Sequence, residues 1–208
     1  MKSHVIRVLA AVAAFPIVVA AADADKPAKS AKAKPKPFTA TCPVMGTPAV
    51  KESSIAFLSK KLYFCCPGCP DQFDPTQADH RTKAHFQLAQ TGQITQVACP
   101  IGGHDPDETL FVKINGVKVM LCCEGCQKKL SKMPAEKQMQ AVFAKIDKHY
   151  SLQTSCPVSG KPIRPEYGVK YKGKMVYLHG GPERRAFQAN PAKFLSKLPQ
   201  FAKPKAGK

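Results

Sequence analysis

The spacing of the nine cysteines constrains this chain more than any other feature. Three cysteines that each precede a proline stand 57 residues apart: Cys42, Cys99 and Cys156. A cluster 23 residues after the first of them recurs 57 residues later: Cys65, Cys66 and Cys69, then Cys122, Cys123 and Cys126. Apolar residues keep the same period: Phe73, Leu130 and Phe187, and also Phe86 and Phe143. A repeat without insertions predicts three tandem copies of one small fold, called here the first (38–94), second (95–151) and third (152–202) copies.

Each copy is predicted to contain a Cys-Pro turn, a β-hairpin and a C-terminal helix, which is an α+β class. Asn115-Gly116, at the junction of predicted strands 109–115 and 117–122, is a strong hairpin signal. Lys172-Gly173 holds that place between 168–171 and 174–178, and Ser59-Lys60 is the weaker candidate in the first copy. The cysteine cluster then falls at the junction of a strand end and a helix start.

Helices are predicted in the second half of each copy. In the second copy, apolar residues recur at helical spacing: Met139, Val142, Phe143 and Ile146. In the third copy, Pro182 suits the first turn of one helix and Pro191 the start of another.

The N-terminus has the pattern of an export signal. Lys2 and Arg7 flank an apolar run that ends in alanines, which predicts a signal peptide over residues 1–24 and a periplasmic or secreted protein. An uncleaved membrane anchor is the alternative. Residues 25–37, rich in Lys, Ala and Pro, are predicted to form a disordered tether, and residues 203–208 a basic tail.

The net charge of +18 narrows the choice of partners. These terminal segments account for part of it, and residues 38–202 keep an excess of ten positive charges. The basic ends favour weak association with an anionic membrane surface. A nucleic-acid partner is not expected, because no basic motif is interleaved with aromatic residues.

The cysteine clusters have the composition of a soft-metal site. A helix N-terminus favours thiolate, the form that binds metal, and Cys-x2-Cys pairs hold an ion from a tight turn. Three or four sulfurs suit Zn(II), Cu(I) or an iron site, and Cu(I) or Zn(II) is the predicted ion. The candidate ligands are Cys42, Cys65, Cys66, Cys69, Cys99, Cys122, Cys123 and Cys126. Adjacent strand residues face opposite ways, so Cys65 and Cys66 remain alternatives, as do Cys122 and Cys123. A thioether ligand from Met45 would favour Cu(I).

The order Cys-Pro-x2-Gly, hairpin, aromatic-Cys-x3-Cys and helix resembles the YHS and TRASH group of small metal-associated domains. The matching strings are YFCCPGC at 63–69 and VKYKGKMVYLH at 169–179, the latter followed by Phe187. The resemblance implies that each of the three copies, over 38–94, 95–151 and 152–202, is a treble-clef-like module. It also implies two ligand sets: Cys42, Cys65 and Cys69, and Cys99, Cys122 and Cys126.

The third copy departs from this pattern. His179 and Glu183 replace the cluster cysteines, and Gly180 replaces their neighbour. Together with Cys156, these donors would suit a harder ion; the alternative is a degenerate capping copy without metal.

The predicted function is a non-enzymatic protein that sequesters, buffers or delivers a thiophilic ion, with a metal transporter or an envelope metalloprotein as partner. A disulfide-stapled repeat protein without metal is one alternative, since exported chains use cysteines for disulfides. A thiol–disulfide redox protein using Cys66 and Cys69 is another. The scattered histidines are expected to be solvated: His80, His85, His104 and His149.

Overall fold

A computed structural model describes residues 38–201 of the chain. The predictions for 1–24, 25–37 and 203–208 lie outside these residues. The described chain mixes helices with small two-stranded sheets, as the α+β expectation requires. None of its helices combines the length and the apolar character needed to cross a membrane.

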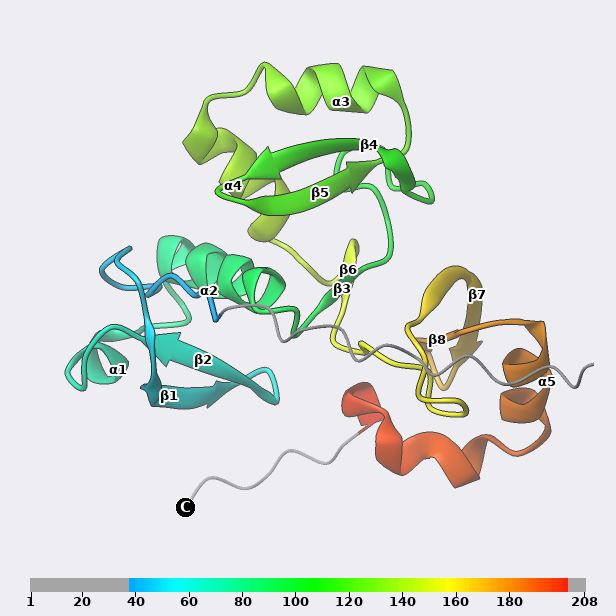
Figure 1. Ribbon diagram of the computed structural model, residues 1–208. Coiled ribbons are helices and arrows are strands. Elements are labelled where there is room, and N and C mark those ends of the chain that lie inside the picture. Colours follow the sequence, from blue (N-terminus) through cyan, green and yellow to red (C-terminus); the bar gives the residue numbers. More distant parts are fainter. Residues whose placement is uncertain (1–37, 202–208) are drawn as a thin grey trace, which may run out of the picture. The chain divides into compact units, whose positions relative to one another are not determined.

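Three antiparallel hairpins recur with the period of the cysteines (Figure 1). Their strands are β1 (Val50–Phe57) with β2 (Lys60–Phe64), β4 (Asp107–Ile114) with β5 (Val117–Leu121), and β7 (Arg164–Tyr171) with β8 (Lys174–Leu178). Each strand of the second and third hairpins begins and ends 57 residues after the equivalent strand of the preceding hairpin. The irregular register in the first strand of each hairpin also recurs, at Val50/Ser54, Asp107/Phe111 and Arg164/Gly168. The sequence period is therefore a period of backbone structure.

The hairpin turns use two residues with left-handed backbone. Asn115 (φ 44°) and Gly116 (φ 85°) form the turn predicted for the second copy, and Lys172-Gly173 is the equivalent in the third. In the first copy the prediction of Ser59-Lys60 is wrong by one residue, because Leu58 (φ 50°) and Ser59 (φ 61°) make the turn. Side chains such as Leu avoid this conformation, so the local sequence carries no signal for it.

Two helical segments follow each of the first two hairpins, and three follow the third. They are α1 (Cys69–Gln72) and α2 (Ala78–Gln90), α3 (Glu124–Ser131) and α4 (Ala135–Phe143), and α5 (Gly181–Ala189) with the 3-10 segments η1 (Pro191–Lys197) and η2 (Pro199–Phe201). Pro182 lies in the first turn of α5 as predicted, whereas Pro191 begins a 3-10 helix. Ile146, predicted to continue the second-copy helix, lies beyond the end of α4. A short pair, β3 (Thr95–Gln96) and β6 (Tyr150–Ser151), joins chain segments far apart in sequence.

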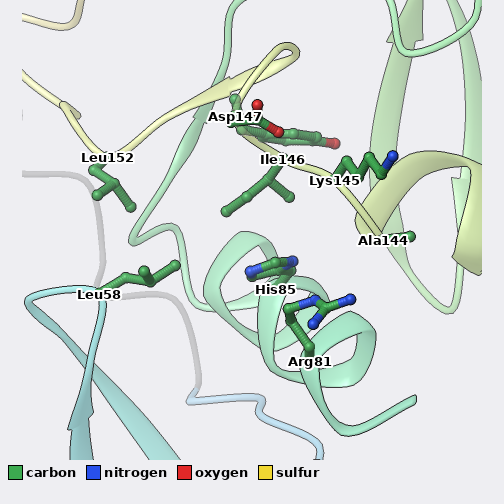
Figure 2. Close-up of a pocket in the computed structure, with 9 residues that line it drawn as sticks. Leu58, Arg81, His85, Ala144, Lys145, Ile146, Asp147 and Leu152 are labelled. Atoms are coloured by element: carbon green, nitrogen blue, oxygen red, sulfur yellow. The ribbon is translucent and has the colours of Figure 1, made fainter. Parts of the chain in front are cut away.

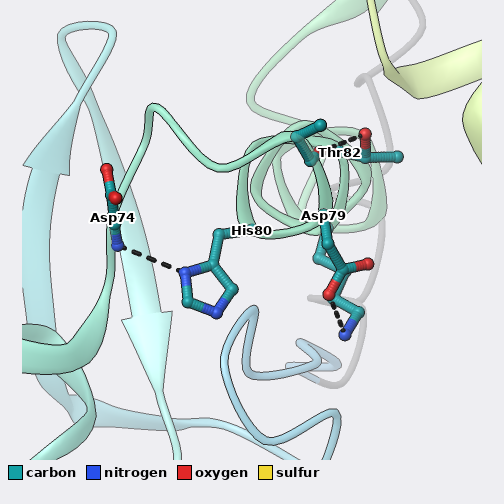
Figure 3. Close-up of polar contacts among 6 residues, drawn as sticks. Asp74, Asp79, His80 and Thr82 are labelled. Carbon is teal, nitrogen blue, oxygen red and sulfur yellow. Dashed lines mark hydrogen bonds and ion pairs between the residues drawn. The ribbon is translucent and has the colours of Figure 1, made fainter.

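A polar loop separates α1 from α2 and makes α1 half as long as α3 (Figure 3). Pro75 disfavours helix at Asp74, which precedes it. The Asp74 N–H donates to His80 Nδ1 (3.2 Å), and the Asp74 carboxylate accepts from Thr76, which lowers the pKa of that carboxyl group. Asp79 pairs with Lys83 (2.7 Å) in the first turn of α2. Interactions within the loop and the first turns of α2 therefore account for the end of α1 and the start of α2.

The same register positions are buried in all three copies. The second strand of each hairpin places two side chains inside: Leu62 and Phe64, Val119 and Leu121, Val176 and Leu178, all fully buried. Leu130 of α3 and Phe187 of α5 cover them. Burying one such side chain stabilises a fold by about 1.5–3 kcal/mol. The repeated apolar positions therefore form equivalent small cores.

The first two copies share part of a core across the predicted boundary at 94/95. Phe86 of α2 and Phe143 of α4 are equivalent positions, and their rings contact edge to face with centroids 5.4 Å apart. Leu88 and Ile94 belong to the same buried cluster as Val119. The third copy has its own cluster around Val176.

Candidate metal centre

A tight turn, called here the knuckle, places the first cysteine of each copy. In the first copy, the Cys42 N–H donates to the Thr47 carbonyl (2.8 Å) and the Gly46 N–H to the Cys42 carbonyl (2.9 Å). The turn closes through Gly46 at φ 73°, a conformation that glycine adopts without strain. The same two bonds recur around Cys99 and around Cys156. All three of these cysteines are buried.

Two groups of three sulfurs converge where a knuckle meets the end of a hairpin. Site 1 consists of Cys42, Cys65 and Cys69, and site 2 of Cys99, Cys122 and Cys126; within each, the sulfurs lie within 4.8 Å of one another. The Sγ atoms are 3.5 Å apart for Cys65–Cys69 and 3.7 Å for Cys122–Cys126. Metal–thiolate bonds of about 2.3 Å in a tetrahedral site put two sulfurs about 3.8 Å apart. Both groups therefore have the spacing of a thiolate metal site.

The structure separates the adjacent cysteines that the sequence left as alternatives. Cys65 and Cys122 belong to the two sites, whereas Cys66 and Cys123 are exposed beside them. The Cys66 Sγ lies 3.3 Å from that of Cys69. Because β2 and β5 end just before these pairs, one member of each pair turns inward and the other faces solvent.

The knuckle lowers the pKa of its cysteine in both sites. Burial raises the pKa of Cys42, but hydrogen bonds from the backbone of Met45, Cys65 and Val44 together lower it below its usual value. Cys99 has its pKa lowered against burial in the same way, and the Gly102 N–H lies 3.2 Å from its Sγ. Backbone N–H groups stabilise the thiolate because they donate to its negative charge.

In each site the pKa of the cysteine on the helix side is raised. The thiol of Cys66, and then burial, raise the pKa of Cys69. Burial, followed by the thiols of Cys123 and Cys122, raises the pKa of Cys126 to about 12. A cation that enters either site must therefore displace protons, so binding there becomes weaker as the pH falls.

A buried glutamine links the knuckle to the second hairpin strand in each copy, and we call this contact the glutamine clasp. In the second copy, the Gln96 side-chain amide donates to the carbonyls of Ala98 (3.0 Å) and Met120 (2.6 Å) and accepts from the Met120 N–H (2.9 Å). Gln153 makes the same three bonds in the third copy. Ala98 directly precedes Cys99, and Met120 lies two residues before Cys122. The clasp therefore holds the backbone segments of these two ligands together.

In the first copy the glutamine clasp comes from a different element. Gln87 of α2 donates to the carbonyls of Thr41 (2.8 Å) and Tyr63 (2.6 Å) and accepts from the Tyr63 N–H (2.7 Å). The position equivalent to Gln96 is Thr39. The spacing of Gln96 and Gln153 was a signal that the sequence interpretation missed, whereas Gln87 lies outside the register and gives no such signal.

No known protein family, curated protein or solved structure matches this chain. The assignment of sites 1 and 2 therefore depends on the geometry of the chain itself. All nine cysteines are free thiols in the structure, and six of them form the two sites.

The third copy keeps the knuckle without assembling a third site. Within residues 38–201, sites 1 and 2 are the groups of three or more Cys, His, Asp or Glu donors that lie within 4.8 Å of one another. Cys156, His179 and Glu183 do not form such a group. The His179 Nδ1–H instead donates to the Pro162 carbonyl (2.9 Å).

A hollow of about 450 Å³ lies away from the sulfurs, between α2 and the segment after α4 (Figure 2). Leu58, Ile146 and Leu152 give it apolar walls, and the His85 ring faces it. The expectation that His85 is solvated is wrong: it is buried, its Nδ1–H donates to the Phe143 carbonyl (2.7 Å), and burial lowers its pKa. This hydrogen bond ties α2 to the end of α4.

Proposed function

We propose that this protein binds two thiophilic ions, Cu(I) or Zn(II), one at site 1 and one at site 2. The observation that carries the proposal is the convergence of three cysteine sulfurs within 4.8 Å at two places related by the 57-residue period. Soft thiolates select these metals from the harder cations, which prefer oxygen.

The donors fit a site that binds and releases its ion. Three thiolates supply more negative charge than Cu(I) or Zn(II) carries, and they leave one coordination position of a tetrahedral ion open. Cys66 and Cys123 are exposed beside sites 1 and 2, where a thiolate can take over a ligand position as the ion arrives or leaves. This arrangement supports a role in sequestering, buffering or delivering the metal, with a metal transporter or an envelope metalloprotein as partner.

The order of elements also supports membership of the YHS and TRASH group, with a treble-clef-like module in each copy. A knuckle with a glycine at positive φ, a hairpin and a helix after the hairpin recur in that order. In this proposal the protein is not an enzyme, and it acts in the periplasm or outside the cell.

The deciding experiment is a metal titration of the full chain under anaerobic, reducing conditions, read by elemental analysis after gel filtration. We expect two bound equivalents. Cys65→Ser should lower the count to one, because it removes a sulfur from site 1. Cys66→Ser is the matched control one residue away and should leave two equivalents.

Three results would count against the proposal. Retention of both equivalents in Cys65→Ser would mean that site 1 is misplaced. A thiol count showing two disulfides in each of the first two copies, together with no bound metal, would favour the disulfide-stapled protein instead. Insulin reduction above background would favour the redox protein.

A further inference from the structure

One position of the knuckle faces the metal site. In the second copy this position is Gly102, the third residue after Cys99. A Cβ atom added there would lie 2.8 Å from the Sγ of Cys122 and 3.1 Å from that of Cys126. A side chain at this position of the knuckle therefore points at the sulfurs of the site.

In the first copy the equivalent position holds Met45. The two knuckles have matching backbone hydrogen bonds and matching positive-φ glycines, Gly46 and Gly103. Met45 also directs its backbone N–H to the Sγ of Cys42, as Gly102 does to Cys99. By equivalence with Gly102, we place the Cβ of Met45 on the side of the knuckle that faces site 1. The thioether sulfur lies two bonds further along the side chain.

Met45 is not part of the protein core. Its side chain is 62% exposed, the largest exposure among the large hydrophobic residues of the described chain. Because no packing holds it, the side chain can turn toward an ion bound at site 1 at little cost. Leaving a methionine in water at the opening of a three-sulfur site has no packing benefit that would explain it.

We infer that the Met45 sulfur is the fourth ligand of site 1 when that site holds Cu(I), whereas Gly102 leaves site 2 with three thiolates and an open face. This inference rests on the proposed function and adds a difference between the two sites. A thioether is a soft, neutral donor that suits Cu(I) and binds Zn(II) poorly. Site 1 is therefore selective for Cu(I), and site 2 accepts either ion and exchanges it with an external ligand.

The direct test follows the methionine methyl groups of the full chain by NMR, with ¹³C in all six methionines. Adding Cu(I) under anaerobic conditions should shift the Met45 methyl signal as site 1 fills. Zn(II) should fill site 1 without that shift. Met175, an exposed methionine of the third copy, is the internal control and should not move.

Variants give an independent measurement. In a Cys122→Ser background, which leaves site 1 alone, Met45→Leu keeps the size and apolar character of the side chain but removes the thioether. The loss of one soft ligand should lower Cu(I) affinity in chelator competition by about tenfold and change Zn(II) affinity by no more than about twofold. Met175→Leu should change neither.

The outcomes separate this inference from the proposed function. Two bound equivalents with an unmoved Met45 methyl, or an unchanged Cu(I) affinity in Met45→Leu, would overturn the inference and leave the proposed function standing. Absence of metal from the unmodified protein would overturn the proposed function as well. An equal loss of Cu(I) and Zn(II) affinity would make Met45 a structural residue of the knuckle and would also overturn the inference.

Discussion

The second and third copies have nearly the same backbone and different donors. Their hairpins begin and end at equivalent positions, both knuckles close through a glycine at positive φ, and the glutamine clasp recurs. Yet Cys122 and Cys126 belong to site 2, while their counterparts His179 and Glu183 do not assemble with Cys156.

The comparison shows that the scaffold closes without the two cluster cysteines, while the knuckle cysteine stays in the core of both copies. Buried apolar residues and the clasp hold the third copy together, with Val176 and Phe187 fully buried. Cys122 and Cys126 are then an addition to a fold that closes without them. Metal loss should therefore weaken the second copy without unfolding its core, unlike domains whose folding energy comes from zinc.

Grafting a site onto the third copy is the strongest test of this comparison. Changing His179→Cys and Glu183→Cys together should raise the number of bound equivalents from two to three, because Cys156 is already buried in a knuckle of the same geometry. Elemental analysis after gel filtration measures this. His179→Cys alone supplies too few sulfurs and should leave two. If the double variant also binds only two equivalents, the backbone of the third copy does not bring three sulfurs together as that of the second copy does.

Removing the glutamine clasp should affect both copies alike. Gln96→Leu leaves three buried or half-buried backbone groups without partners, and each unpaired group costs about 1–3 kcal/mol. We expect the free energy of unfolding to fall by about 3 kcal/mol in chemical denaturation. Gln153→Leu should have a similar effect. Gln140→Leu, on the exposed side of α4, is the control.

The effect of removing the clasp on metal affinity should distinguish the second copy from the third. Gln96→Leu loosens the knuckle of Cys99 against the strand of Cys122 and should weaken metal binding at site 2 by about tenfold. Gln153→Leu should leave the affinity of both sites unchanged. Equal metal affinities in the two variants would show that the clasp has no part in placing the ligands.

The smallest expected effect concerns pH and the shared core of the first two copies. Burial lowers the pKa of His85 below the usual 6.5, so this side chain stays neutral in the folded protein where the unfolded chain is already protonated. The unfolded state then binds more protons, and stability falls as the pH drops below about 6.5, by at most about 1.4 kcal/mol per pH unit for one group. Denaturation of the metal-free protein at pH 7.5 and 5.5 should show this loss, and His85→Gln should reduce it. An identical pH dependence in that variant would contradict the assignment to His85.

Much of the fold could be predicted where the signal is local. The turn at Asn115-Gly116, strand Lys174–Leu178 and the helix start at Pro182 are confirmed, because each depends on the conformational preference of its own residues. The Leu58-Ser59 turn could not be predicted, since those residues disfavour the conformation that the hairpin imposes on them. The buried state of His85 was missed because it depends on Phe143, 58 residues away.

The sequence by itself determined the 57-residue period and the chemistry of the sulfur donors, because both are properties of the covalent chain. Only the tertiary structure decided which sulfurs converge. Cys65 and Cys66 are the same residue type at adjacent positions, and the backbone direction at the end of β2 turns one inward and the other to solvent. It also decided that Gln87 supplies the clasp of the first copy, because a hydrogen bond requires nearness in space and not a place in the repeat.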